Sequence, residues 1–145
     1  MISNERQYRI TRAAVREFEE ALARLETVEG HRPPEMRQVM REAMESQLEE
    51  LREQVAEYEA LSSHQVTVLE LDSLRDLPIA LIRARIASGL TQKELAGRLG
   101  LKEQQIQRYE ATRYAGVSLE RIQAVADALG VAIRERVTLP SGTGK

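Results

Sequence analysis

The spacing of apolar residues predicts two amphipathic helices in the first half of the chain. From Thr11, which we expect to cap the first helix, apolar side chains recur at steps of four and three: Ala14, Phe18, Ala21, Leu25 and Val28. The segment from Gly30 to Pro34 interrupts this pattern, because a Pro–Pro pair cannot continue a helix. The same spacing returns in a second helix expected from Glu35 to about Leu61, with the seam spacing of a coiled coil: Met44, Leu48, Leu51, Val55 and Tyr58. Residues 1–64 are therefore predicted to form an antiparallel helical hairpin. Its narrow seam favours pairing with a second copy or another chain.

Two further stretches have the pattern of short β-strands. Residues 65–71, QVTVLEL, are β-branched and apolar, and the remainder of 65–77 reads as a linker. Between residues 131 and 139, apolar side chains alternate with polar ones, although Glu135 interrupts the apolar face. This second strand could pair with residues 65–71 or with its own copy in a dimer. Residues 132–145 are thus expected to form a C-terminal strand and a flexible tail.

Between these two stretches, residues 78–131 carry the start and stop signals of four short helices. Pro78 fits the first turn of a helix that ends near Ser88, and Gly89 suits the left-handed residue that follows a helix. Thr91 and Glu94 have the spacing of a capping box. Three signals delimit the last two helices: Gly100 turns the chain before a helix near Lys102, and Ser118 and Gly130 bound the fourth. The second and third of these helices form a predicted helix-turn-helix.

The third helix of this group carries side chains that suit the recognition of DNA bases. Gln104, Gln105, Gln107 and Arg108 follow one another around its exposed side, while Ile106 is the expected inward anchor. Glutamine can form two hydrogen bonds to adenine and arginine two to guanine in the major groove.

The charge distribution agrees with a chain of two unlike halves. Residues 1–75 hold 10 Lys/Arg and 16 Asp/Glu, a balance of −6, whereas residues 76–145 hold 11 and 7, a balance of +4; together they give −2. The basic half suits a polyanion and the acidic half another partner. The alternative is that the charges only solvate helix faces.

Composition also argues against several classes of function. The chain has no cysteine, and its two histidines, His31 and His64, are not spaced as metal ligands. The Glu-rich face of residues 35–59 is typical of a solvated helix, and the final SGTGK lacks the spacing of a phosphate loop. We therefore expect no metal, no cofactor and no enzymatic activity. The chain shows no secretion signal and no apolar run that could span a membrane, so a cytoplasmic location is expected.

Residues 78 to about 131 resemble the DNA-binding domain of the Cro/C1-type (XRE) family of bacterial and phage regulators. The matching residues are Gly89-Leu90-Thr91-Gln92, Glu94-Leu95-Ala96, Leu99-Gly100, Ile106, Glu110, and Ala126 with Leu129-Gly130-Val131. The resemblance implies a mainly α chain in which a lambda-repressor-like bundle follows the N-terminal hairpin. The N-terminal half lies outside this resemblance, although its position ahead of such a domain is similar to some antitoxins and antitoxin-like regulators.

The resemblance also implies roles for particular side chains. Gln92 matches a glutamine that contacts phosphate and supports base contacts, and Arg85 and Glu110 match a structural ion pair. Arg113 lies in the following loop, where it either reaches phosphate or the minor groove or is a solvated loop residue. The full set expected to contact DNA is Gln92, Lys93, Lys102, Glu103, Gln104, Gln105, Gln107, Arg108 and Arg113.

Lys102 departs from the family pattern, which has Ser or Thr at this position to cap the reading helix. A lysine is a poor cap and opposes the helix dipole. Either a phosphate contact offsets this cost or the lysine is merely tolerated. Glu103 is also unusual near phosphates, although it could accept a hydrogen bond from cytosine.

These patterns predict a sequence-specific DNA-binding transcriptional regulator. It would be a dimeric repressor on a two-fold operator, with its own promoter among the candidate targets. The main alternative is the antitoxin of a type II toxin–antitoxin pair, which would bind a small protein toxin through its acidic N-terminal helices and repress its own operon. A third hypothesis is an adaptor that binds only proteins through both halves. DNA affinity separates the adaptor from the other two, and a dedicated small partner separates the antitoxin from the free-standing regulator.

Overall fold

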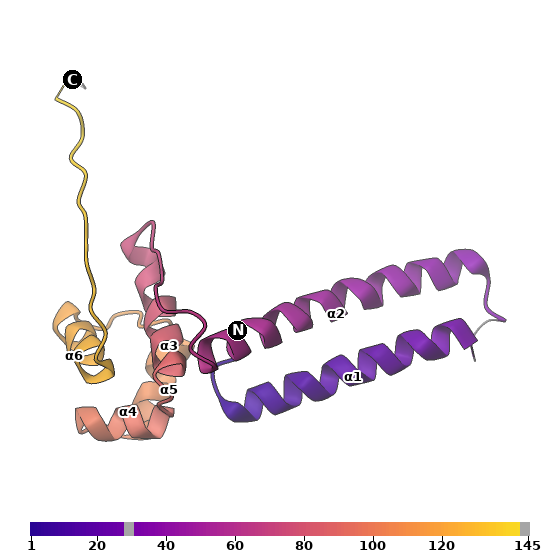
Figure 1. The fold of residues 1–145 in the computed structure, drawn as a ribbon, viewed down its shortest axis with the longest axis horizontal. Helices are drawn as coiled ribbons and strands as arrows, with labels where there is room; N and C mark the ends of the chain where they lie inside the picture. The colour runs from indigo at the N-terminus through magenta and orange to yellow at the C-terminus, as the bar shows by residue number, and fades with distance from the viewer. Residues whose placement is uncertain (28–30, 143–145) are drawn as a thin grey trace.

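The computed structural model of the chain describes residues 1–27 and 31–142 and divides them into a long helical hairpin and a helical bundle (Figure 1). The hairpin consists of α1 (Glu5–Thr27) and α2 (Pro34–Ser62). A short 3-10 turn, η1 (Leu74–Asp76), leads into the bundle, which contains α3 (Leu77–Ala87), α4 (Gln92–Leu99), α5 (Glu103–Ala111) and α6 (Leu119–Leu129). No helix among these residues is long and apolar enough to cross a lipid bilayer.

The first helix begins earlier than its apolar pattern predicts. α1 starts at Glu5, so the expected cap at Thr11 is wrong. Asn4 accepts a hydrogen bond from the backbone nitrogen of Gln7 at 2.8 Å, and the side-chain oxygen of Gln7 accepts one from the nitrogen of Ser3 at 2.8 Å. This reciprocal pattern satisfies amide donors that a helix start otherwise leaves free. The hydroxyl of Thr11 instead donates to the carbonyl of Gln7, one turn back.

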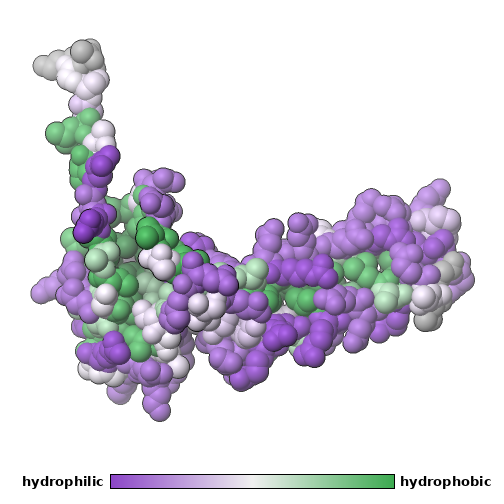
Figure 2. All heavy atoms as spheres, viewed as in Figure 1, coloured by the Kyte–Doolittle hydropathy of each residue, from purple (hydrophilic) through white to green (hydrophobic). Residues whose placement is uncertain are grey.

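The seam of the hairpin is as thin as its spacing predicts. Leu25 of α1 and Leu48 of α2 are buried, whereas most of the other seam residues are only half-buried. In Figure 2 apolar residues show between the two helices, and hydrophilic ones cover their outer sides. Val28 and Gly30, which the sequence places at the end of the first helix and in the turn, lie outside the described residues.

The hairpin joins the bundle through a shared core. Leu61, in the last turn of α2, is 2% exposed and belongs to the same apolar cluster as Leu81 and Ile82 of α3. Glu57 of α2 and Arg83 of α3 form an ion pair at 2.6 Å across this junction. At the same end of the hairpin, the hydroxyl of Tyr8 donates to Glu59 at 2.5 Å, and this bond raises the pKa of Tyr8. One end of the hairpin is therefore held to the bundle and the other extends away from it (Figure 1).

The bundle itself buries an aliphatic core. Leu95, Ile106 and Val125, from α4, α5 and α6, are each 0% exposed. The chain ends each short helix and turns by means of a left-handed glycine: Gly89, Gly100 and Gly130 have φ values of 71°, 68° and 70°. Ser118 caps α6 by accepting a hydrogen bond from the nitrogen of Arg121 at 3.1 Å. The four predicted helices of residues 78–131 are thus observed.

The two predicted β-strands are wrong. Residues 65–71 and 131–139 have no regular secondary structure, and no strand occurs within 1–27 and 31–142. Most of their apolar side chains lack a partner surface: Val68 is 70% exposed, Val137 82% and Leu139 78%. A strand requires a neighbour to satisfy its backbone groups, and the two segments do not lie together in this fold. Alternation in the sequence was therefore not sufficient to predict a sheet.

Candidate DNA-binding surface

The helix-turn-helix formed by α4 and α5 is defined by its caps and its turn. The hydroxyl of Thr91 accepts a hydrogen bond from the nitrogen of Glu94 at 3.0 Å and donates to the Glu94 carboxylate at 3.1 Å. Leu90 and Leu95, on either side of this cap, are both buried. Gly100 then reverses the chain, and its nitrogen bonds to the carbonyl of Gly97 at 3.3 Å. The N-terminus of α4 and the outer side of α5 are thereby held at a fixed angle.

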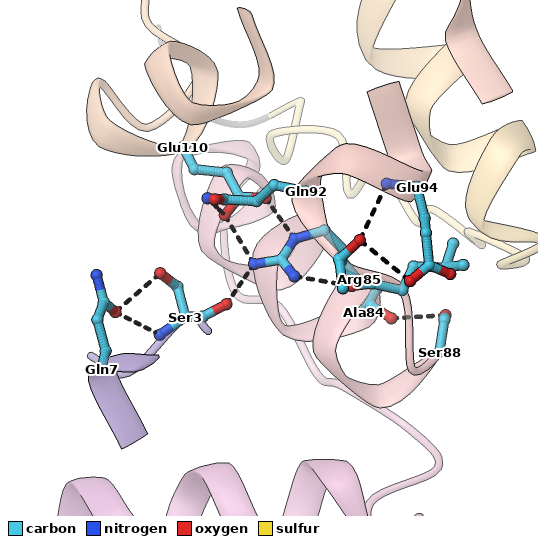
Figure 3. Close-up of polar contacts among 10 residues, drawn as sticks. Ser3, Gln7, Ala84, Arg85, Ser88, Gln92, Glu94 and Glu110 are labelled. Atoms are coloured by element: carbon cyan, nitrogen blue, oxygen red, sulfur yellow. Dashed lines mark hydrogen bonds and ion pairs between the residues drawn. The ribbon is translucent and has the colours of Figure 1, made fainter. Parts of the chain in front are cut away.

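A buried ion pair lies directly beneath these two helices (Figure 3). Arg85 of α3 donates through Nε to Glu110 Oε2 at 2.6 Å and through Nη2 to Glu110 Oε1 at 2.9 Å. The two side chains are only 3% and 5% exposed. Arg85 also donates to the carbonyl oxygens of Leu90 at 2.8 Å and Ser3 at 2.5 Å. This arginine therefore ties together α3, α5, the start of the α4 cap and the N-terminal segment.

Gln92 is connected to the same pair. Its Nε2 donates to Glu110 Oε1 at 2.9 Å, and the side chain is half-buried at the first position of α4 (Figure 3). Held in this way, its carboxamide has a restricted orientation close to the free amide groups of the α4 N-terminus. Such a terminus favours anions such as phosphate. Lys93 follows it and is exposed.

The start of α5 compensates in part for the missing cap. Lysine has no side-chain acceptor, so Lys102 cannot accept a bond from the first turn. Gln105 supplies the other half of a capping box, because its Oε1 accepts a hydrogen bond from the nitrogen of Lys102 at 2.9 Å. Lys102 itself is exposed with no ion pair among the described residues, and its charge lies beside the N-terminus of the reading helix.

The remaining predicted contact residues lie in the solvent along α5 and just after it. Glu103 accepts a long hydrogen bond from Gln107 at 3.5 Å, and Arg113 has a left-handed backbone with φ 52°. Six of the predicted residues on this stretch have exposed side chains that take no part in the cap: Lys102, Glu103, Gln104, Gln107, Arg108 and Arg113. Gln105 is also exposed, although its oxygen is used by the cap. Of the predicted set, the structure brings Gln92, Gln107 and Arg113 to one cleft.

The loop that carries Arg113 is held by Tyr114. This tyrosine is 4% exposed, its ring lies 5.5 Å from that of Tyr109, and its nitrogen bonds to the Tyr109 carbonyl at 2.6 Å. Burial, with a smaller contribution from Glu110, raises the pKa of Tyr114 well above its usual range. Tyr114 therefore packs as a neutral side chain and fixes the backbone of its exposed neighbour, Arg113.

The N-terminal segment also reaches this surface, which the sequence did not predict. An open cleft of about 440 Å³ is lined on one side by Met1, Asn4 and Gln7 and on the other by Gln92, Gln107 and Arg113. Ile2, beside Met1, is 4% exposed. The only sequence signal for this arrangement is the Ser-Asn-x-x-Gln start of α1, which marks the helix end but not its partner.

The comparison with known families identifies this part of the chain. Residues 81–136 match the family described as Helix-turn-helix. They form a helix-turn-helix domain of the Cro/C1 (XRE) type. This domain supports a role of the chain in DNA binding and regulation. No curated protein and no solved structure matches the chain.

Metal binding can be assessed from the arrangement of the His, Asp and Glu side chains. No group of three or more His, Asp or Glu side chains in 1–27 and 31–142 is arranged to hold a metal ion. His31 and His64 are exposed, and His64 lies just beyond the end of α2 with φ 62°.

Proposed function

We propose that this chain is a sequence-specific transcriptional repressor that acts as a homodimer on a two-fold DNA operator. The observation that carries the proposal is the exposed polar face of α5, which the buried Arg85–Glu110 pair holds to α3. Lys102, Gln92 and the α4 N-terminus would bind phosphates, and Gln104 and Arg108 would read base edges. Two such helices on a dimer match half-sites about one helical turn apart. Occupancy of a promoter, its own among the candidates, would block polymerase. We propose that the chain has no catalytic role. We also propose that it acts in the cytoplasm.

Arg108 supplies the test of sequence reading. Replacing Arg108 with alanine should weaken binding to the cognate operator by about 1–3 kcal/mol and relax the choice of base at one position. The operator is first obtained by selection from a random duplex pool with the full chain, and affinities are then measured by fluorescence anisotropy. The matched control is Arg134→Ala, another exposed arginine, in the segment after α6. Equal losses on cognate and scrambled DNA would show that Arg108 contacts only phosphate.

The dimeric state has its own measurement. Sedimentation of the full chain with the selected duplex should give two chains per operator, and the protected bases should form an inverted repeat. One chain per duplex with a single protected half-site would contradict the dimer and leave the DNA-binding domain unaffected.

A second candidate function rests on the charge of α2. This helix carries eight glutamates and three arginines, a balance of −5, and five of its glutamates in the middle of the helix are exposed: Glu42, Glu45, Glu49, Glu50 and Glu53. A hairpin that extends from the bundle with an acidic face could bind a basic protein in a helix-in-groove mode. This would make the chain the antitoxin of a toxin–antitoxin pair that also represses its operon.

Co-expression distinguishes the two functions. The tagged chain is produced together with the genes that flank it, and the eluted proteins are identified. A small, basic, growth-inhibiting companion at fixed stoichiometry, released when Glu45, Glu49 and Glu53 are replaced with glutamine, would support the antitoxin. A homodimer that binds its own upstream DNA alone would support the free-standing repressor.

A further inference from the structure

The charges of α1 are segregated along the helix. Residues 6–16 contain four arginines and no acidic residue, namely Arg6, Arg9, Arg12 and Arg16, whereas residues 17–26 contain four glutamates and one arginine, Arg24. At 100° per residue the first four arginines occupy about a third of the circumference of the helix. This arc is opposite the side on which the seam residues Phe18 and Leu25 lie, and Tyr8, which stacks on Tyr58 of α2, lies between the two sides. The four side chains form what we call the arginine stripe, and all are exposed.

The arginine stripe is electrostatically unfavourable for α1 itself. Positive charge near a helix N-terminus opposes the helix dipole. Arg6–Arg9, Arg9–Arg12 and Arg12–Arg16 are like-charge pairs three or four residues apart, each of which destabilises a helix slightly. Glu5, four residues before Arg9, and Glu19 and Glu20, after Arg16, offset part of this cost. None of the four forms an ion pair with a carboxylate in 1–27 or 31–142, and Arg12 interacts with Tyr8, whose ring lies 5.7 Å away. A feature that costs stability and pairs with no carboxylate of the described residues points to an external anion.

The position of the stripe indicates which anion. The end of α1 that carries Arg6 lies next to the DNA-binding surface, because Asn4 and Gln7 line the same cleft as Gln92 and Arg113. The arginines lie on the other side of the helix, since Gln7 is five full turns before Leu25 and therefore shares its face. In Figure 1, α1 lies on the side of the hairpin toward which α4 and α5 lie, and Figure 2 shows hydrophilic residues along that edge. From Arg6 to Arg16 the stripe extends for about 15 Å, at 1.5 Å per residue. It therefore begins beside the reading helix and leads away from it.

We propose that the arginine stripe is a second DNA contact, which binds the phosphate backbone of the duplex flanking the bases read by α5. It adds affinity without sequence choice, because guanidinium groups bind phosphate whatever the base. The hairpin is then part of the DNA-binding apparatus at its attached end, and only its far, glutamate-rich end is left for other partners. This inference rests on the DNA binding of the proposed function.

The test uses the salt dependence of binding to a random-sequence duplex of about 30 base pairs, since phosphate contacts need no operator. Binding of the full chain is followed by anisotropy between about 50 and 300 mM KCl. The triple variant Arg6→Gln/Arg9→Gln/Arg16→Gln should lower the slope of log affinity against log salt by about 2–3 per bound chain and weaken binding at low salt about tenfold or more.

The chain contains a matched control on the same face of α1. Arg24 lies five helical turns, about 27 Å, beyond Arg6 and is also exposed. The single variant Arg9→Gln should lower the slope by about 0.9, whereas Arg24→Gln should leave it unchanged. The melting temperature of the triple variant is measured beside that of the unmodified chain, and DNA binding is compared well below both. A loss of DNA binding under these conditions does not come from unfolding.

Three results would overturn the proposal. In the first, the triple variant keeps the slope of the unmodified chain. In the second, Arg24→Gln lowers the slope as much as Arg9→Gln, which would show that binding depends only on net charge. In the third, sedimentation shows that the triple variant loses self-association, so that the stripe binds the acidic α2 of a second copy. If the unmodified chain fails to bind any duplex, the proposed function fails. If the triple variant binds with the slope of the unmodified chain, only the role of the arginine stripe fails.

Discussion

Replacing Glu110 with alanine should destabilise the bundle by about 3–5 kcal/mol, which is a large part of the stability of a small domain. The carboxylate accepts two of the four hydrogen bonds that the Arg85 guanidinium donates, and one from Gln92. Its removal leaves a buried cation that retains only the carbonyl oxygens of Leu90 and Ser3. The free energy of unfolding is measured by urea denaturation followed by circular dichroism.

The adjacent pair on the same helix provides the control. Arg83 of α3 contacts Glu57 through Nε at 2.6 Å, the distance that separates Arg85 from Glu110, but its two side chains are 38% and 36% exposed. Arg83→Ala should therefore cost no more than about 1 kcal/mol, because water solvates the glutamate that remains. Similar costs for the two variants would show that burial does not strengthen the Arg85–Glu110 interaction. Glu110→Gln, which retains an acceptor, should cost less than Glu110→Ala.

Most of the DNA-binding domain could be predicted because its signals are local. The caps at Thr91 and Ser118 and the left-handed glycines each act within a few residues, so the order of residues is enough to place the helices. The ion pair of Arg85 with Glu110 joins residues 25 apart. No spacing rule reaches that far, and this contact was expected only from the family resemblance.

The errors have a common physical origin in contacts between distant segments. The predicted strands required a partner strand, and the fold does not bring residues 65–71 and 131–139 together. The start of α1 is set by the Asn4 cap, which lies ahead of the first residue of the apolar repeat, Ala14. The bond from Arg85 to the carbonyl of Ser3 joins residues 82 apart. The proximity of the N-terminus to the DNA-binding surface could therefore be found only from the structure.

Replacing Leu95 with alanine should also unfold much of the bundle, at a cost of about 2–5 kcal/mol. Leu95 is 0% exposed, and it belongs to the core that also contains Ile106 of α5 and Val125 of α6. The loss combines the transfer of apolar surface with the cavity that remains in a close-packed interior. Leu95 is also one half of the apolar contact that frames the Thr91 cap, so the entry to α4 should loosen together with the core.

Leu74→Ala is the matched control, because this leucine of η1 is 73% exposed and its replacement should change stability by less than about 0.5 kcal/mol. Both variants are compared in the same urea titration, and duplex binding is measured below the transition. Leu95→Ala should lose DNA affinity in proportion to its unfolded fraction, because the core holds α4 and α5 at their relative angle. If Leu95→Ala were as stable as Leu74→Ala, the packing of α4 on α5 and α6 would be wrong, and with it the surface on which Gln92 and Arg108 lie together.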